Sequence, residues 1–233
     1  MKKNNKYTLM QKEYYENETG RMRIGNHKEH NTKNYYNILL SDIKNNSNNF
    51  KDKIALDFGC GCGRNVKNLL EMADWKRVDG IDISSNNIKY CNEYLKELGY
   101  TSDKFMFKSS NGIDCKPLKN EVYDFVVSTI TLQHICVHEI RYNILKDIFR
   151  IMKPGGIFSL QVGYDKKQGN GVGYYENYYD ANKTNSKCDF AVEDENYMIK
   201  DLEMIGFNYI TYEIINSCSD HSHNKWIYFR MVK

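Results

Sequence analysis

The sequence predicts an α/β fold with a seven-stranded, mostly parallel sheet, a last strand that runs antiparallel, and helices on both faces. Three observations lead to this prediction. Short apolar segments alternate with helical patterns from residue 51 onward, which is the order of βαβ units. Parallel sheets built from such units are covered on both faces. The last two apolar segments are close together in the chain, which favours an antiparallel pair.

The strands are expected where short apolar runs end at turn residues. Between them, apolar residues recur every three or four positions, as at Val66, Leu69 and Leu70, which is the spacing of a helix with one buried face. A further helix is expected at 194–205, before Gly206. The expected strands cover residues 54–58, 77–83, 104–108, 123–128, 157–162, 208–215 and 226–232.

Two parts of the chain depart from this alternation. Residues 1–50 are polar and rich in Tyr, Asn and Lys, and apolar residues at helical spacing predict a helix over 31–45. Residues 163–193 show no clear period and predict a long ordered insertion. We therefore divide the chain into an N-terminal segment, 1–50, and a main domain, 51–233, that carries the inserted loop.

The composition excludes several classes of protein. The chain has 233 residues and a net charge of +3, from 33 basic and 30 acidic side chains, so it lacks the basic excess of a dedicated duplex binder. No apolar stretch approaches the length needed to span a bilayer. The 7 cysteines, without an export signal, are typical of reduced thiols in the cytoplasm.

The most informative stretch is the turn that follows the first expected strand. Glycine occupies every second position, 59, 61 and 63, and such a turn lets backbone amides approach a ligand closely. Dinucleotide dehydrogenases and S-adenosylmethionine (SAM) methyltransferases share turns of this kind. The dehydrogenase pattern G-x-G-x-x-G fails in both registers, because its third glycine would fall on Arg64 or Val66.

The pattern from Asp57 to Gly63, acid-x-G-x-G-x-G, resembles motif I of the Rossmann-like class I SAM-dependent methyltransferases. The resemblance covers residues 51–162 and continues through Asp82, which ends the second strand and by this resemblance takes both ribose hydroxyls of SAM. It implies SAM as cofactor and S-adenosylhomocysteine (SAH) as product. The family often has Asp where this chain has Asn111. The cofactor-binding residues that the resemblance implies are Asp57, Gly59, Cys60, Gly61, Gly63, Arg64, Asn65, Asp82, Ile83, Asn111, Gly112, Ser128, Thr129 and Gln133.

Two histidines are candidates for a general base. His134 and His138 are four residues apart and share a face if that segment is helical. A neutral histidine can take a proton from a hydroxyl as the methyl group arrives. The alternative is that both histidines serve only packing or lie at the surface.

Several residues are candidates for binding the methyl acceptor. The family's N-terminal segment often folds over the active site, so we expect residues 1–50 to act as a helical lid. Arg21, Arg23 and His27 would then meet an anionic group, or form only a solvated basic run. Tyr174 and Tyr178 would form an aromatic wall, or only pack the inserted loop.

The expected function is methyl transfer from SAM to oxygen of a small molecule such as a sugar, a nucleotide sugar or an anionic metabolite. The chain has no Pro-Pro pair, so the motif of base-amine methyltransferases is missing and nucleic acid is disfavoured as substrate. Cys60 and Cys62 lack partners at zinc spacing, so no metal is expected. N-methylation, a non-catalytic SAM-binding partner and a nucleotide-dependent oxidoreductase remain alternatives. The expected assembly is a monomer or a homodimer.

Overall fold

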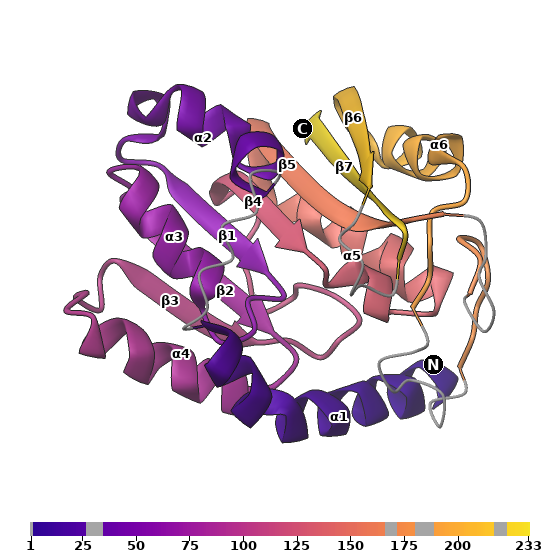
Figure 1. Cartoon of the computed structure of the whole chain (residues 1–233), viewed down its shortest axis with the longest axis horizontal. Helices are drawn as coiled ribbons and strands as arrows, with labels where there is room; N and C mark the ends of the chain where they lie inside the picture. The colour runs from indigo at the N-terminus through magenta and orange to yellow at the C-terminus, as the bar shows by residue number, and fades with distance from the viewer. Residues whose placement is uncertain (1, 27–34, 166–171, 180–188, 217–222) are drawn as a thin grey trace.

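The structure is a computed structural model that describes residues 2–26, 35–165, 172–179, 189–216 and 223–233 (Figure 1). A single seven-stranded sheet with the order β3-β2-β1-β4-β5-β7-β6 forms its centre. The first five strands are parallel, whereas β7 runs antiparallel to both β5 and β6, as the sequence predicts. The strands are β1 (Ile54–Phe58), β2 (Arg77–Asp82), β3 (Phe105–Ser109), β4 (Tyr123–Thr129), β5 (Met152–Tyr164), β6 (Asn208–Asn216) and β7 (Lys225–Val232).

Helices cover both faces of this sheet, and each face has its own apolar core. The helices α3 and α4 and the segment 35–50 pack on one face, where Trp75 and Phe125 are fully buried. The helices α5 and α6 pack on the other, around Phe158 and Phe207. The bounds of the longer helices are α3 (Arg64–Met72), α4 (Ser85–Glu97), α5 (His138–Ile151) and α6 (Glu195–Ile205).

The strand order reverses next to β1, because β2 lies on one side of it and β4 on the other. In open α/β sheets, ligands bind in the crevice beyond the carboxyl ends of the strands at such a reversal. The turn after β1 and the loop after β4 both leave the sheet at this point. The topology alone therefore places a binding site there.

Two predicted elements differ from the observed ones. Strand β5 begins at Met152 rather than 157, because the chain already pairs with Tyr123 before a register shift brings Ile157 opposite Phe125. The helix predicted over 31–45 is interrupted in its described part by Leu40, between a π-helical turn (η1, Tyr35–Leu39) and the short α2 (Ser41–Asn45). A 3-10 turn (η2, Ser47–Phe50) completes this segment.

The longest helix is α1 (Lys2–Asn26), which the sequence pattern did not predict. It runs along the lower edge of the molecule in Figure 1, below the ends of β1 and β2, and reaches α4 at its carboxyl end. Its buried positions are mostly polar, including Thr8, Gln11 and Thr19 beside Tyr7. Without an apolar stripe of period 3.6, a helix leaves no pattern for sequence analysis to detect.

The described parts of the predicted insertion pack against the body of the protein. Val172 bridges to Phe190, Tyr164 to Val192, and Val137 to Asn177. The guanidinium of buried Arg141 donates hydrogen bonds to the carbonyl groups of Ile135 and Tyr174, and so ties this segment to α5. Within the described ranges, no helix combines the length and apolar composition needed to cross a bilayer.

Candidate active site

A cavity of about 680 Å³ opens where the strand order reverses. This volume lies within the range of natural small-molecule sites. Its walls come from the turn after β1, the ends of β2 and β3, the loop after β4, and α1. The lining residues are Tyr7, Thr8, Gln11, Tyr15, Phe58, Gly59, Cys60, Gly61, Cys62, Arg64, Asn65, Ile81, Asp82, Ile83, Ser110, Gly112, Thr129, Ile130, Thr131, His134, Ile135 and Ile144.

The glycine turn has a backbone that other residues would not adopt. Gly59, Gly61 and Gly63 have φ of 76°, 52° and 86°, in the left-handed region. A Cβ atom on Gly59 would lie 2.1 Å from the side chain of Thr131, in the loop after β4. The turn and this loop therefore approach each other more closely than a side chain at residue 59 would permit. The backbone of the turn lines the cavity.

Asp57, near the end of β1, is a carboxyl group buried within the protein. Its side chain is fully buried, and within the described chain neither carboxylate oxygen accepts a hydrogen bond. Burial raises the pKa of this carboxyl to about 7, although the nearby Asn65 side chain acts in the opposite direction. A buried carboxylate of this kind requires a proton or a positive partner. Arg64, at the start of α3, supplies part of that positive charge, because its guanidinium acts to lower the pKa of Asp57.

Asp82, at the end of β2, is held in a defined orientation. Its Oδ2 accepts a hydrogen bond from the backbone N–H of Gly61 at 2.9 Å. Its Oδ1 accepts from the N–H of Ser84 at 2.8 Å and from Nδ2 of Asn87 at 3.2 Å. Burial raises the pKa of Asp82 to about 6, against these bonds. Because each carboxylate oxygen has more than one acceptor position, Asp82 can still accept from two adjacent hydroxyls in the cavity.

The structure brings together nine of the residues predicted to bind the cofactor. Five others do not line the cavity. Asp57 is buried in β1, and Gly63 faces Cys91, whose sulfur would lie 3.2 Å from a Cβ at that position. Ser128 donates to the carbonyl of Phe58, and Gln133 is buried 3.4 Å from Asp189. The lining residues of this set are Gly59, Cys60, Gly61, Arg64, Asn65, Asp82, Ile83, Gly112 and Thr129.

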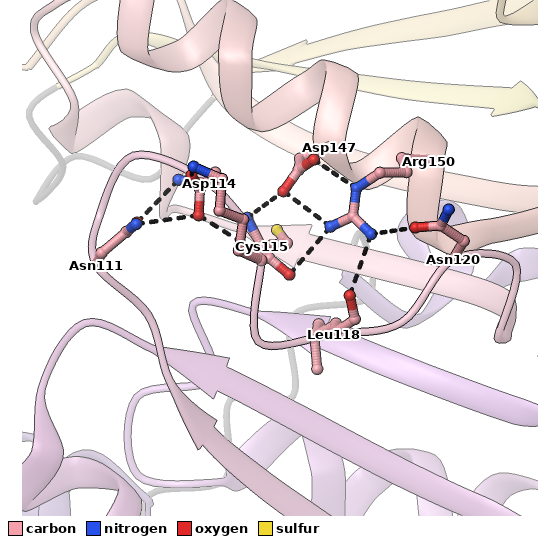
Figure 2. Close-up of polar contacts among 8 residues, drawn as sticks. Asn111, Asp114, Cys115, Leu118, Asn120, Asp147 and Arg150 are labelled. Atoms are coloured by element: carbon pink, nitrogen blue, oxygen red, sulfur yellow. Dashed lines mark hydrogen bonds and ion pairs between the residues drawn. The ribbon is translucent and has the colours of Figure 1, made fainter.

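Asn111, the fifth of these residues, serves its own loop. Its Oδ1 accepts from the N–H groups of Ile113 and Asp114, and its Nδ2 donates to Asp114 (Figure 2). The same loop is anchored to α5, since Asp147 accepts from the N–H of Cys115 and binds Arg150 (Figure 2). Its neighbours Ser110 and Gly112 are the ones that line the cavity.

The two histidines have different environments, because one continuous helix does not contain both of them and the condition for a shared face is not met. His134 ends the 3-10 turn η3 (Leu132–His134), whereas His138 begins α5. His134 lines the cavity, and its Nδ1 lies 2.7 Å from Oδ1 of Asp189. His138 lies outside the lining and is paired with Asp201 at 2.7 Å. Burial acts to raise the pKa of Asp189, but hydrogen bonds from His134 and His223 hold it well below its usual range.

The residues predicted to bind the acceptor are placed elsewhere or not described. The Arg23 guanidinium lies 4.2 Å from the ring centre of Tyr90 on α4, outside the cavity. His27 and the side chain of Arg21 lie outside the described residues. Tyr174 is buried and donates to Asp201, and the N–H of Tyr178 donates to Cys136. Neither tyrosine lines the cavity.

Sequence analysis missed the residues that α1 contributes to the cavity, namely Tyr7, Thr8, Gln11 and Tyr15. It also missed Asp189, which lies 55 residues from its partner His134. Neither had a local signal, because a polar helix shows no period and a pair so distant in sequence shows no spacing.

Comparison with known families agrees with this geometry. Residues 56–160 match a family described as "Methyltransferase domain". Over these residues the chain is therefore similar to the class I, SAM-dependent methyltransferases. The match begins within β1 and ends within β5, so it contains the glycine turn, Asp82 and the loop after β4.

Among curated proteins, the chain is similar to the erythromycin 3''-O-methyltransferase of Saccharopolyspora erythraea. The two are 29% identical over 106 residues, which are 46% of this chain and 33% of that protein. The similar region thus spans about a third of the length of this relative.

Two solved structures share the fold. One is the methyltransferase partner of the Trm112 activator of Haloferax volcanii, with a TM-score of 0.66 and 15% identity, over 94% of this chain and 96% of that one. The other is the phosphoethanolamine N-methyltransferase 2 of Haemonchus contortus, with a TM-score of 0.61 and 16% identity, over 84% and 52% of the two chains. The latter was solved with SAH bound.

SAM is the cofactor that the similarity to methyltransferases implies, and two structures of the Haemonchus contortus enzyme hold SAH or SAM. The residues present fit it, since the backbone of the glycine turn and the carboxylate of Asp82 both line the cavity. Across the part of the chain that the structure describes, no group of three or more His, Cys, Asp or Glu side chains is arranged to hold a metal ion.

Proposed function

We propose that this chain transfers the methyl group of SAM to a hydroxyl oxygen of a small, sugar-like acceptor. The observation that carries this proposal is the pairing of His134 with Asp189 at 2.7 Å in the wall of the cavity. A hydroxyl is a weak nucleophile until its proton is removed, and a histidine held by a carboxylate is suited to remove it. The O-methyltransferase name of the curated relative supports oxygen as the methylated atom.

The roles of the residues follow from their places. The backbone of the glycine turn and Asp82 would hold the amino-acid end and the ribose of SAM. When bound, SAM supplies an activated methyl group, so the protein mainly aligns donor and acceptor. Donation from His134 Nδ1 to ionised Asp189 leaves Nε2 of the ring unprotonated and basic.

A neutral acceptor fits the cavity better than an anionic metabolite. Arg64 is the one Lys or Arg in the lining so far as the structure describes it, and it lies at the glycine turn. The lining also includes Tyr7, Tyr15, Ile135 and Ile144, which offer apolar surface and phenol groups. Such walls suit the faces and hydroxyls of a sugar ring.

We also propose that residues 1–50 form a lid over this cavity and that 163–193 act as an inserted loop beside it. The support is that α1 lines the cavity with four side chains and that Asp189, within the inserted loop, holds His134. Closure of such segments excludes water from the reacting groups.

The test is turnover with a panel of sugars, nucleotide sugars and small amines, measured as SAH formed from SAM. We expect SAH only with hydroxyl acceptors, and a 10²–10⁴-fold lower kcat for His134→Gln with unchanged SAM affinity. His138→Gln is the matched control, because His138 has the same kind of carboxylate partner outside the cavity. Equal kcat values for His134→Gln and wild type would exclude His134 as the general base.

The alternatives give different results in the same assay. Turnover only with amines would show N-methylation, which needs no base when the amine is already neutral. SAM binding without turnover on any acceptor would point to a non-catalytic partner subunit.

A further inference from the structure

We infer that α1 and the cofactor site are thermodynamically linked, through Glu16 as a latch and through the hydrogen-bonded chain Thr19–Asn87–Asp82. Docking of the helix and binding of the cofactor then strengthen each other, and Asn87 is a positioning residue for Asp82. This inference rests on the proposed contact of Asp82 with the ribose of SAM.

Glu16 binds the amino-terminal end of α4 with both carboxylate oxygens. Oε1 accepts from the N–H of Ser85 at 2.9 Å and from its hydroxyl, and Oε2 accepts from the N–H of Asn86 at 2.9 Å and the hydroxyl of Ser84 at 3.2 Å. In return, Nδ2 of Asn86 donates to the backbone carbonyl of Glu16 at 3.1 Å. The unpaired amides at a helix amino terminus favour a negative charge, so this contact fixes α1 against α4.

A second contact leads from α1 into the cofactor site. The Thr19 hydroxyl donates to Oδ1 of Asn87 at 2.8 Å, and Nδ2 of Asn87 donates to Oδ1 of Asp82 at 3.2 Å. All three side chains are buried. Because Oδ1 of Asn87 is taken by Thr19, the amide must present its donor side to Asp82. The sulfur of Cys62, in the glycine turn, also lies 3.6 Å from Asn87 Oδ1.

Few apolar contacts hold the helix elsewhere, which makes it sensitive to these polar contacts. Leu9 is 62% exposed and the buried positions are mostly polar, so little apolar area is removed from water when α1 docks. Tyr7 anchors the other end by accepting from the N–H of Cys136 at 2.8 Å. Elements with few apolar contacts open at low free energy, and a ligand that binds only the docked state then stabilises them.

The cofactor site in turn depends on the helix. Thr8, Gln11 and Tyr15 supply one wall of the cavity, and a Cβ on Gly112 would lie 3.3 Å from Thr8. When α1 leaves, this wall is lost, and Asn87 loses the partner that orients it toward Asp82. By linkage, the factor by which docking improves cofactor affinity equals the factor by which cofactor improves docking.

The experiment is calorimetric titration of the full chain with SAH, for wild type and five single variants. We expect Glu16→Gln and Thr19→Val to raise Kd about 3- to 10-fold, the size of one or two lost hydrogen bonds. Thr19→Ser keeps the hydroxyl and is expected to bind within two-fold of wild type. Glu13→Gln, the same change at an exposed position of α1, is the matched control and is expected to change nothing.

A double-mutant cycle separates this inference from the proposed site. Asp82→Asn should weaken SAH binding. When Thr19→Val is added to Asp82→Asn, the Kd for SAH should rise by less than a further two-fold, because Thr19 acts through Asp82. Full additivity, or Glu16 and Thr19 variants that bind like Glu13→Gln, would overturn the linkage while leaving Asp82 in the site. If Asp82→Asn instead bound SAH with wild-type affinity, the proposed contact of Asp82 with the cofactor would be rejected.

Amide hydrogen exchange provides the reciprocal measurement. SAH should slow exchange in α1 and at the start of α4, and this protection should shrink in Glu16→Gln by the same factor as the affinity. Equal protection of α1 in Glu16→Gln and wild type would contradict the latch.

Discussion

Asp57 and Asp82 lie at or near the ends of neighbouring strands, but their carboxylate groups differ in the hydrogen bonds that they accept. Asp82 accepts three hydrogen bonds, two from backbone N–H groups and one from Asn87, whereas the Asp57 oxygens accept none within the described chain. Burial raises the pKa of both, to about 6 for Asp82 and about 7 for Asp57. Asp82 is thus preorganised to bind neutral hydroxyl groups. The charge of Asp57 is opposed by burial and only partly offset by Arg64 and Asn65.

Asp57→Asn is expected to stabilise the cofactor-free protein at pH 8. An acid whose pKa is raised on folding keeps its proton up to a higher pH in the folded state than in the unfolded state. The free energy of unfolding therefore falls as pH rises from about 4 to 7. The raised pKa of about 7, against an ordinary value near 3.9, corresponds to at most about 4 kcal/mol. Urea unfolding at pH 5 and pH 8 measures the effect.

The amide variant should exceed wild type in stability at pH 8 and approach it at pH 5, while it binds SAH more weakly. Asp74→Asn, at an exposed position, is the control and should show neither effect. A wild-type stability that does not fall between pH 5 and 8 would rule out a buried Asp57 charge.

Asp82→Ala is expected to weaken SAM binding by about 100-fold or more. Two hydrogen bonds from ribose hydroxyls to an ionised carboxylate contribute about 1.5–3 kcal/mol each. Calorimetric titration checks this value, with circular dichroism to confirm that the variant is folded. An unchanged Kd would remove Asp82 from the cofactor site.

At the scale of elements, the loop after β4 and the inserted segment are held together by one buried cation. Arg141 on α5 is 2% exposed, donates to the carbonyl groups of Ile135 and Tyr174, and lies 3.8 Å from the ring centre of Phe190. Burial lowers its pKa to about 10. The arrangement places Asp189, next to Phe190, within reach of His134.

Arg141→Leu is expected to lower the free energy of unfolding by about 2–5 kcal/mol, because it leaves two carbonyl groups without a donor. We also expect faster hydrogen exchange at 172–179 and a reduced kcat, since Asp189 would no longer be held beside His134. Lys146→Leu, at an exposed position on the same helix, is the control. Unchanged stability and exchange in Arg141→Leu would show that the segment is held by other contacts.

At the scale of the whole molecule, the cavity is assembled from separate parts of the chain around one strand-order reversal. The glycine turn and Asp82 come from β1 and β2, His134 from the loop after β4, and one wall from α1. Ligand binding at such a site stabilises the whole fold, because the contacts exist only when all these parts are in place.

SAH at 100 times its Kd is expected to stabilise the protein by about 2.7 kcal/mol, which corresponds to a rise in Tm of about 5–11 °C for a chain of this size. NAD and NADP at the same concentration are expected to leave Tm unchanged. A scan of thermal unfolding with each compound distinguishes the methyltransferase from the oxidoreductase alternative, which a rise with NAD alone would favour.

Local patterns in the amino-acid sequence were sufficient to predict the sheet, the glycine turn and the acid at the end of β2. These features depend on neighbours a few residues apart, so apolar periods and a run of alternate glycines are sufficient to predict them. This is why the strands from β1 to β7 were predicted nearly in place, apart from the early start of β5.

The contacts between distant polar groups depend on the three-dimensional fold. In the folded chain α1 lines the cavity, His134 pairs with Asp189, His138 pairs with Asp201, and Asn111 forms hydrogen bonds within its own loop. A polar side chain has the same local signature whether it binds a ligand or a neighbouring element. Its role depends on which distant element the fold brings beside it, and no local pattern contains that information.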